Sequence, residues 1–155
     1  MPQKSAGILM YRRAGDGVEV LLVHPGGPMW RNKDVGAWSI PKGLYDDEEP
    51  LVAARREFCE ETGAPPPEGA FIDLGVHRQP SGKRIAAFAV EGDFDVARFA
   101  SNTFPLEWPP RSGRIVDFPE ADRAGWFAPD EALRKIAKGQ APILRALFAR
   151  LGIKD

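Results

Sequence analysis

The sequence predicts a single domain of the α/β (α+β) class, with a mixed β-sheet that carries helices on both faces. Three observations lead to this fold. The chain has 155 residues, the size of one ordinary domain with one core. Its strand and helix patterns follow one another as hairpin, helix, hairpin and final helices, which suggests packed layers. It lacks the regular strand–helix alternation of a doubly wound parallel fold.

The first hairpin is predicted at the N-terminus. The β-rich runs SAGILMYRR and VEVLLVHP predict strands at about 5–12 and 18–24, and Asp16-Gly17 between them is a two-residue hairpin signal. The next segment is too long to be a plain connection and holds a short strand, predicted at Ala37 to Ile40. Long ordered loops are usually functional.

A helix is predicted from Glu49 or Pro50 to Thr62, with Gly63 as its end. The runs FIDLGVHR and RIAAFAVEG then predict two strands around the turn QPSGK. Residues 94–123 are predicted to be irregular because they contain several prolines. Two helical segments, broken by Gly139 and Pro142, are predicted to complete the chain.

Composition excludes several classes of protein. The net charge of −1 gives no overall attraction to nucleic acid, so no stable nucleic-acid complex is expected. The apolar run Ala6 to Met10 is too short for a signal peptide or a membrane span, so we expect no membrane contact and a cytoplasmic protein. The single cysteine, Cys59, excludes an intrachain disulfide. GxGxxG and GxxxxGK[ST] patterns are absent, and any anionic ligand must be held locally.

Three glutamates crowd the end of the predicted helix. The segment RREFCEETG places Glu57, Glu60 and Glu61 within an arc of about 100°, although a helix C-terminus disfavours negative charge. Neighbouring carboxylates raise the pKa of at least one of them unless a cation neutralises the group. Oxygen donors of this kind suit Mg²⁺, for which Mn²⁺ can substitute. Charge pattern alone also allows a solvated acidic face paired with Arg55 and Arg56.

The wider spacing favours a metal site. The segment GLYDDEEPLVAARREFCEETGA, residues 43–64, resembles the Nudix box, G-x5-E-x7-R-E-U-x-E-E-x-G-U, where U is a bulky aliphatic residue. The positions after the first glycine are matched in order by Glu48, Arg56, Glu57, Phe58, Glu60, Glu61, Gly63 and Ala64. The matched identities from Glu48 to Gly63 make a chance match unlikely in a chain of this length.

One spacing departs from the pattern. Gly43 is followed by four residues before Glu48, whereas the motif has five; Glu49 would restore that spacing but would leave six residues before Arg56. We favour Glu48 because a deletion is easier in a loop than in a helix, where it would rotate all later positions by about 100°. Phe58 and Ala64 are loose matches at positions that concern packing.

The resemblance implies an α/β/α sandwich in which the box helix packs against a mixed sheet, as one Nudix hydrolase domain over residues 1–155. It implies Mg²⁺ as cofactor and a small-molecule nucleotide as substrate. Glu57, Glu60 and Glu61 match the metal ligands, one of which also serves as base in some members. Arg56 matches the orienting arginine and Glu48 the assisting glutamate. The resemblance requires no partner chain and leaves a homodimer open.

Further candidates lie outside the motif. The resemblance implies one further acid beyond the second hairpin, for the metal centre or the base role. Glu107 and Glu120 are the candidates, and Glu120 is favoured because it precedes the WF segment. The expected substrate-binding residues are Lys42 for a phosphate, Arg111 and Arg114 for an anion, and Trp30 and Trp108 for a base. Lys42, Arg111 and Arg114 are also explained as ordinary exposed loop residues.

Three functions follow from the resemblance. The first is a Mg²⁺-dependent pyrophosphohydrolase that cleaves a diphosphate linkage in a nucleoside diphosphate derivative. Its leading substrates are dinucleoside polyphosphates or nucleoside triphosphates, because PKG before the box is similar to the diadenosine polyphosphate hydrolase branch. The second is an ADP-ribose or nucleotide-sugar pyrophosphatase, to which Pro80, sixteen residues after Ala64, points. The third is a non-catalytic nucleotide-binding sensor.

Overall fold

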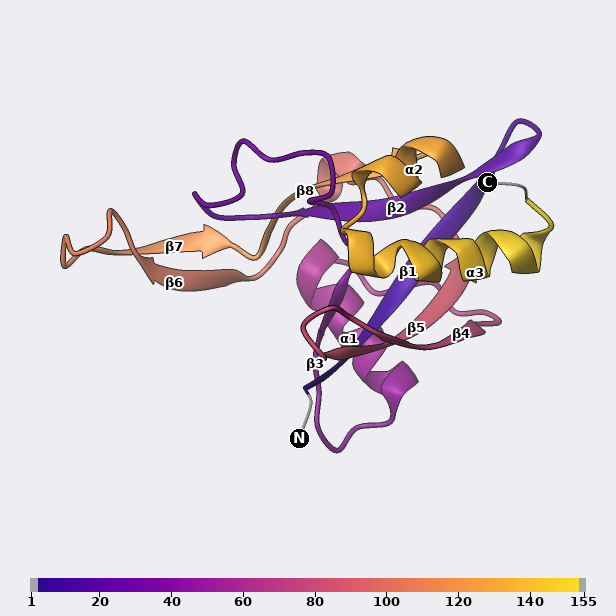
Figure 1. Ribbon diagram of the computed structural model, residues 1–155, viewed down its shortest axis with the longest axis horizontal. Coiled ribbons are helices and arrows are strands. Elements are labelled where there is room, and N and C mark those ends of the chain that lie inside the picture. Colours follow the sequence, from indigo (N-terminus) through magenta and orange to yellow (C-terminus); the bar gives the residue numbers. More distant parts are fainter. Residues whose placement is uncertain (1–2, 154–155) are drawn as a thin grey trace.

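A six-stranded mixed sheet forms the centre of the molecule (Figure 1). The computed structural model describes residues 3–153. The strands are β1 (Lys4–Ala14), β2 (Gly17–Pro25), β3 (Lys42–Leu44), β4 (Ile72–Arg78), β5 (Arg84–Glu91), β6 (Thr103–Glu107), β7 (Ile115–Pro119) and β8 (Ala121–Phe127). The helices are α1 (Pro50–Thr62), α2 (Pro129–Lys135) and α3 (Ala141–Leu151), with short 3-10 turns η1 (Val96–Arg98) and η2 (Lys138–Gln140).

Strand β1 lies in the middle of the sheet, whose order is β4-β5-β1-β2-β8. It runs parallel to β5 and antiparallel to β2 and β3. One edge of β1 is shared, because residues 5–7 pair with β3 and residues 11–14 pair with β2. This sharing brings β3, which carries the first residues of the Nudix-like segment, to the centre of the sheet.

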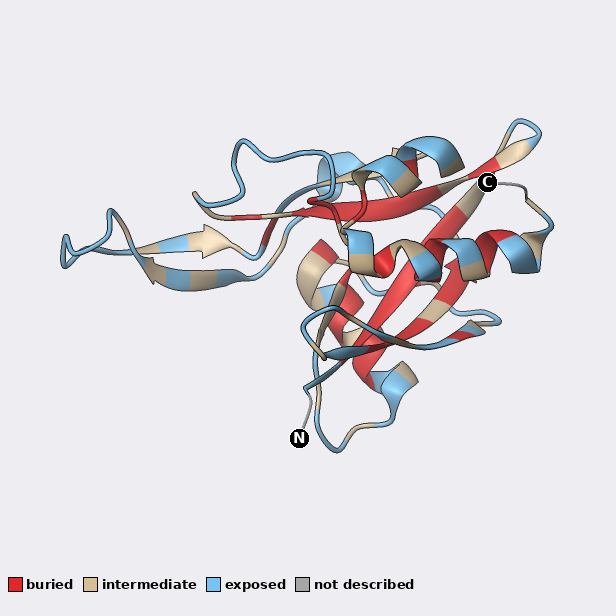
Figure 2. Cartoon of the chain, viewed as in Figure 1, coloured by how far each residue is buried: buried red, intermediate tan, exposed pale blue. Residues whose placement is uncertain are grey.

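Helices cover both faces of the sheet. Ala6, Ile8 and Met10 of β1 pack in one apolar cluster with Phe58 of α1. The alternate residues of β1, such as Leu9, belong to a second cluster with α2 and α3. Figure 2 shows the resulting buried layer between the helices. Because side chains alternate between the faces of a strand, a strand buried on both faces is apolar throughout, as β1 is.

The predicted box helix is confirmed. Helix α1 starts at Pro50 after Glu49 and stops at Gly63, whose φ of 86° is left-handed and whose N–H bonds to the Cys59 carbonyl. A left-handed glycine after the last turn satisfies helix carbonyls without a side-chain clash. The two predicted hairpins, at 5–24 and 71–92, are also present as β1–β2 and β4–β5.

The strand predicted at Ala37 to Ile40 is wrong. In that segment Trp38 and Ser39 form isolated bridges, to Ile136 and Val23 respectively. Because neighbouring residues pair with different segments, no ladder extends along them. The regular strand in this region is β3, a few residues later, where the chain reaches the free edge of β1.

The prediction that residues 94–123 are irregular is also wrong. They contain η1, β6, β7 and the start of β8, and β6 pairs with β7 as a two-stranded hairpin that projects from the body (Figure 1). Proline is tolerated on an edge strand whose N–H side faces solvent, and every strand of a two-stranded ribbon is an edge. The two helical segments expected at the end are confirmed, but β8 before them was not expected.

Within residues 3–153, no helix has both the length and the hydropathy that a membrane span requires.

Candidate active site

The acidic face of α1 is held rigidly against the sheet. Ala53, Ala54 and Phe58 are fully buried and fix the helix on β1. Glu57, one position before Phe58, is itself only 8% exposed, and Glu60 and Glu61 are half-buried. The carboxylates therefore project from an anchored element, as a precise ligand site requires.

Arg56 joins three of the predicted site residues, all glutamates, into one network. Its guanidinium donates two hydrogen bonds to Glu48, from Nε to Oε2 at 3.0 Å and from Nη2 to Oε1 at 2.6 Å. Its Nη1 donates to Oε2 of Glu57 at 2.7 Å and to Oε2 of Glu60 at 3.2 Å. A two-point guanidinium–carboxylate pair fixes orientation as well as charge. Arg56 thus fixes how these carboxylates are turned.

Glu48, and not Glu49, is the partner of Arg56. Glu49 occupies the position before the first turn of α1, where its side chain makes no capping hydrogen bond. Glu48 is held by Arg56, whose hydrogen bonds, together with its positive charge, lower the pKa of Glu48. The geometry therefore agrees with the shorter loop from Gly43.

Gly43 lies directly against Glu57. A Cβ atom placed on Gly43 would overlap the Glu57 carboxylate. Gly43 is opposite Ala6 in the β1–β3 pairing, so its free face points towards α1. The glycine at the start of the Nudix-like segment is thus required for space beside a carboxylate.

Burial governs the electrostatics of the remaining carboxylates. Burial raises the pKa of Glu57, an effect that the Arg56 hydrogen bond opposes. Burial raises the pKa of Glu61 to about 8, with Lys42 acting in the opposite sense and Glu120 and Glu57 adding to the rise. Burial also raises the pKa of Glu120, with a contribution from Glu60. These carboxyl groups are near enough to repel one another and favour a counter-cation.

Arg56 supplies a positive charge to this group of carboxylates. In the described part of the chain, no three acidic, histidine or cysteine side chains converge as a ready metal cage. Glu57 and Glu60 are turned to Arg56 instead. The donor set still fits a hard divalent cation, since it consists of carboxylate oxygens on one anchored helix face.

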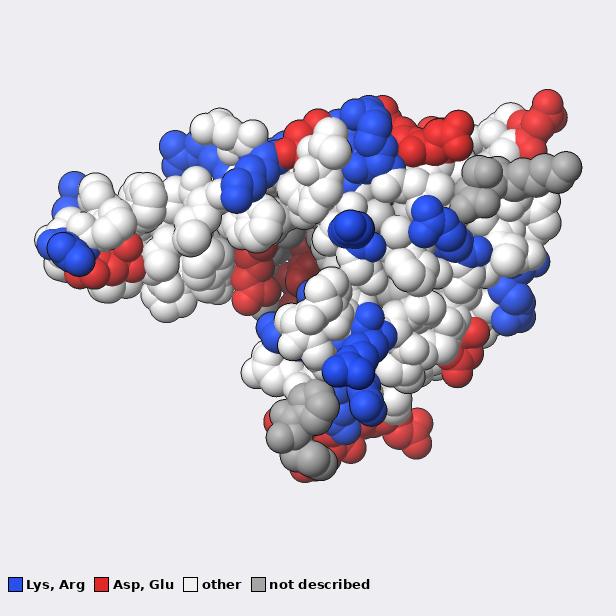
Figure 3. All heavy atoms as spheres, in the orientation of Figure 1, with Lys and Arg blue, Asp and Glu red and all other residues white. Residues whose placement is uncertain are grey.

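Glu120 and Glu107 differ in their surroundings. Glu120 influences the pKa of Glu57 and of Glu61 and therefore lies beside the cluster. Glu107 accepts hydrogen bonds from the N–H groups of Arg111 and Gly113 and closes the turn between β6 and β7. Figure 3 shows acidic atoms on the floor of a hollow between the projecting hairpin and the body.

The other predicted residues are divided between two places. Lys42, on β3, is half-buried beside Glu61, and burial lowers its pKa. Trp30 is 40% exposed in the loop after β2, with the Lys33 ammonium 5.2 Å from its ring centroid. Arg111, Arg114 and Trp108 lie in or beside the turn at the far end of the β6–β7 hairpin (Figure 1). The structure does not bring these last three to the glutamates of α1.

Substitution of Glu48 should lower activity, whereas the same substitution of Glu49 should not. Glu48→Gln removes the charge that holds Arg56, and loss of an orienting partner typically costs about 10–100-fold in activity. We expect a fall in kcat of that size, while Glu49→Gln stays near the wild-type value because its side chain has no partner in this network. The comparison uses kcat of wild type and both variants on the same substrate. Equal effects of the two substitutions would contradict the pairing.

Metal-free protein should lose stability as the pH rises. The Glu61 carboxyl titrates near 4.5 ordinarily and near 8 in the fold, so the folded state keeps a proton that the unfolded chain loses. The contribution of Glu61 to stability is therefore greatest below about pH 4.5 and is lost as the pH rises through 8. In EDTA we expect Tm to drop by several degrees across this window, with about 2–4 °C for each kcal/mol.

The Glu61→Gln variant tests whether Glu61 causes this pH dependence of stability, because glutamine does not titrate. Its Tm should depend less on pH than that of the wild type, whereas Glu68→Gln, at an exposed glutamate paired with Arg55, should leave the dependence unchanged. If Glu61→Gln and wild type lost stability in parallel, another group would be responsible.

Comparison with known proteins agrees with the fold. A family model described as NUDIX domain matches residues 1–147. Among solved structures, the NUDIX domain of Shewanella oneidensis NrtR complexed with ADP ribose has a TM-score of 0.66 at 15% identity, covering 97% of this chain and 89% of that chain. A mutT/nudix family protein from Listeria innocua has a TM-score of 0.64 at 19% identity, covering 98% and 96%. A C. elegans Ap4A hydrolase has a TM-score of 0.59 at 20% identity, covering 97% and 98%.

Proposed function

The chain belongs to the NUDIX domain family, and on that premise we propose that it is a divalent-metal-dependent pyrophosphohydrolase of one domain over residues 1–155. It cleaves a diphosphate linkage in a nucleoside diphosphate derivative. The observation that carries the proposal is the network in which Arg56 orients Glu48, Glu57 and Glu60 beside the close approach of Gly43. Carboxylates that are oriented and partly buried in this way fit a cation site. Carboxylates on a solvated helix face would not need to be oriented.

Glu57, Glu60 and Glu61 would hold Mg²⁺, with Mn²⁺ as a substitute. When bound, such a cation neutralises diphosphate oxygens and lowers the pKa of an attacking water. The raised pKa values of Glu57 and Glu61 support this role. Their charged forms are costly in the buried site until a cation is present, so cation binding relieves a repulsion built into the fold.

The remaining site residues position the reactants. Arg56 keeps the carboxylates turned to one side through hydrogen bonds that also fix Glu48. Glu120, whose pKa burial raises, is our candidate to accept a proton from the attacking water. Lys42 places a positive charge beside Glu61 and would contact a substrate phosphate.

Dinucleoside polyphosphates and nucleoside triphosphates are the leading substrates. The likeness in fold to an Ap4A hydrolase and the PKG segment before the box support this choice. ADP-ribose is the alternative, because the NrtR domain of similar fold is complexed with ADP ribose. The two choices differ in the number of phosphates that the site must accommodate.

A panel of substrates tests the function. Phosphate release or nucleotide products should be measured with Mg²⁺ for diadenosine polyphosphates, nucleoside triphosphates, ADP-ribose and nucleotide sugars. We expect turnover of at least one of these and none in EDTA. If no substrate is turned over while nucleotides bind measurably, the chain is a nucleotide sensor and the hydrolase proposal is wrong.

A further inference from the structure

A row of cations crosses the sheet on the α1 side. Lys4 of β1 is directly opposite Arg84 of β5, and Arg84 is directly opposite Arg78 of β4. Residues opposite one another in a ladder point to the same face, so the three side chains belong to one face of the sheet. Tyr45 lies next to this row of cations, because its N–H donates to the Lys4 carbonyl at 3.1 Å.

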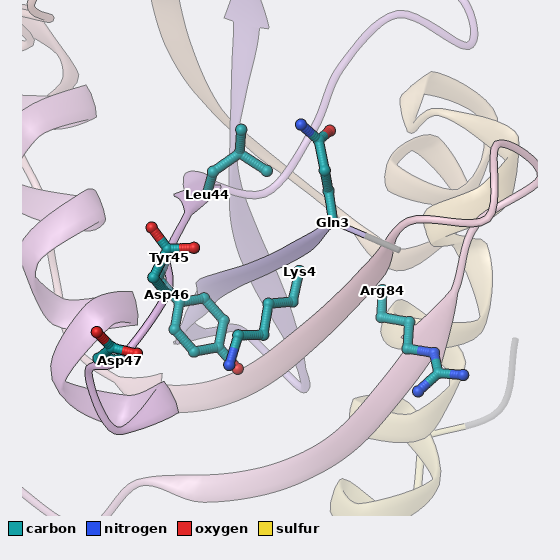
Figure 4. A pocket seen from close by; sticks show the side chains of 7 residues that line it. All are labelled: Gln3, Lys4, Leu44, Tyr45, Asp46, Asp47 and Arg84. Carbon is teal, nitrogen blue, oxygen red and sulfur yellow. The ribbon is translucent and has the colours of Figure 1, made fainter. Parts of the chain in front are cut away.

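The row lines two adjoining cavities. One, of about 690 Å³, is lined by Lys4, Tyr45 and Arg84 among others (Figure 4). The second, of about 430 Å³, is lined by Arg78 and Lys83 and shares Arg84 with the first. The two together form a continuous concave surface along the row.

The positive charges of this surface are not neutralised within the described residues. Lys4, Arg78, Lys83 and Arg84 are exposed, and across residues 3–153 none of them has a carboxylate at ion-pair distance. The Lys4 ammonium lies 4.7 Å from the centroid of the Tyr45 ring. Like charges placed directly opposite in a sheet destabilise it. An anion between them would remove that cost.

Two aspartates share the larger cavity but lie at its other end. Figure 4 shows Asp46 and Asp47 on the loop after β3, with Arg84 on the opposite side and Lys4 between them. The cavity is thus polarised from an acidic end towards a basic end. The Lys4 side chain is directed towards Tyr45 (Figure 4), so an anionic group would bind on the Arg84 side of Lys4.

The cation row is close to the proposed catalytic glutamates. Gly43, which lies against Glu57, is opposite Ala6 of β1. Lys4 is two residues before Ala6 on the same face, about 7 Å along the strand. This spacing allows one molecule to reach both places if it carries phosphates beyond the diphosphate that is cleaved.

We infer that Lys4, Arg84 and Arg78, with Lys83 and Tyr45, form a subsite for a further phosphate-bearing part of the substrate, remote from the cleaved linkage. The inference rests on the proposed function for its location next to the reaction. The subsite favours substrates with more than two phosphates over substrates whose only phosphates are the two of the cleaved linkage. Tyr45 bounds the subsite and provides a ring face beside the bound group.

Binding of inorganic tripolyphosphate in EDTA tests the subsite without the metal site. We expect calorimetry to show binding that weakens with salt, and the double variant Lys4→Gln/Arg84→Gln to raise Kd by at least about tenfold. Arg13→Gln removes an exposed cation from the other end of β1 and should leave Kd unchanged. Melting curves should show the double variant folded, with a Tm no lower than wild type, because its substitutions remove a repulsion.

Kinetics decide whether the bound group belongs to the substrate. For a diadenosine polyphosphate, the double variant should raise KM by at least about fivefold and leave kcat unchanged. For ADP-ribose, neither constant should change. Unaltered tripolyphosphate binding in the double variant would overturn the subsite, and an unaltered KM despite lost binding would show that the anion is a separate ligand. Absence of turnover in wild type would overturn the proposed function, while the binding result in EDTA would stand.

Discussion

Glu57→Gln is expected to lower kcat by at least about a hundredfold while the protein stays folded. Glu57 is nearly buried between Gly43 and Arg56, and its charge is the feature that a cation would use. Loss of groups that merely support a metal ligand costs about 10–100-fold, so loss of a ligand should cost no less. Glutamine keeps the size of the side chain and can still accept the Arg56 hydrogen bond. Its neutrality also suits a buried position in which the carboxyl pKa is raised.

The matched control is Glu68→Gln, the same chemical change at an exposed glutamate paired with Arg55. Its kcat should equal that of the wild type. Steady-state rates in Mg²⁺, with melting curves for all three proteins, make the comparison. Near-normal rates in Glu57→Gln would show that Glu57 is not the ligand that we propose.

Gly43→Ala should reduce kcat by about 10–100-fold through displacement of the same carboxylate. The added methyl group would overlap the end of the Glu57 side chain, which can swing away at little cost to the fold. Displaced from this position, Glu57 would no longer lie where Arg56 now holds it. We therefore expect the Gly43→Ala variant to lose activity and its rate to respond less to added metal. Its Tm should stay close to that of the wild type.

Gly17→Ala is the matched control for that change. Gly17 begins β2, and a Cβ atom there would meet nothing within 4 Å. Its variant should keep full activity. If Gly43→Ala were as active as Gly17→Ala, the contact between Gly43 and Glu57 would not affect activity.

The box helix could be predicted from the sequence because its signals are local. Pro50 and Gly63 mark its ends, and the positions of Glu57 and Glu60 relative to Arg56 follow from helical geometry. The choice of Glu48 over Glu49 was also possible from the sequence, because a deletion is tolerated in a loop more easily than in a helix. The hydrogen bonds between Glu48 and Arg56 were not predicted. The sequence could not predict which residues of the sheet lie against each carboxylate, such as Gly43 against Glu57.

The remaining differences come from long-range pairing. Prolines between residues 94 and 123 suggested irregular chain, yet β6 and β7 pair with each other in a ribbon where an edge proline costs little. The same hairpin carries Arg111 and Arg114 away from α1. The cation row also depends on strand order, because Lys4 and Arg84 become neighbours only when β1 and β5 run side by side in parallel. Nothing in either local segment indicates that arrangement.

Binding of Mn²⁺ measured by EPR tests the central claim most directly, because free Mn²⁺ gives a signal that is lost on binding. The wild-type protein should bind Mn²⁺, Mg²⁺ should compete for the same site, and Glu57→Gln should raise Kd by at least about tenfold, whereas Glu68→Gln should not. Equal Mn²⁺ affinity in wild type and Glu57→Gln would contradict a metal site on the acidic face of α1.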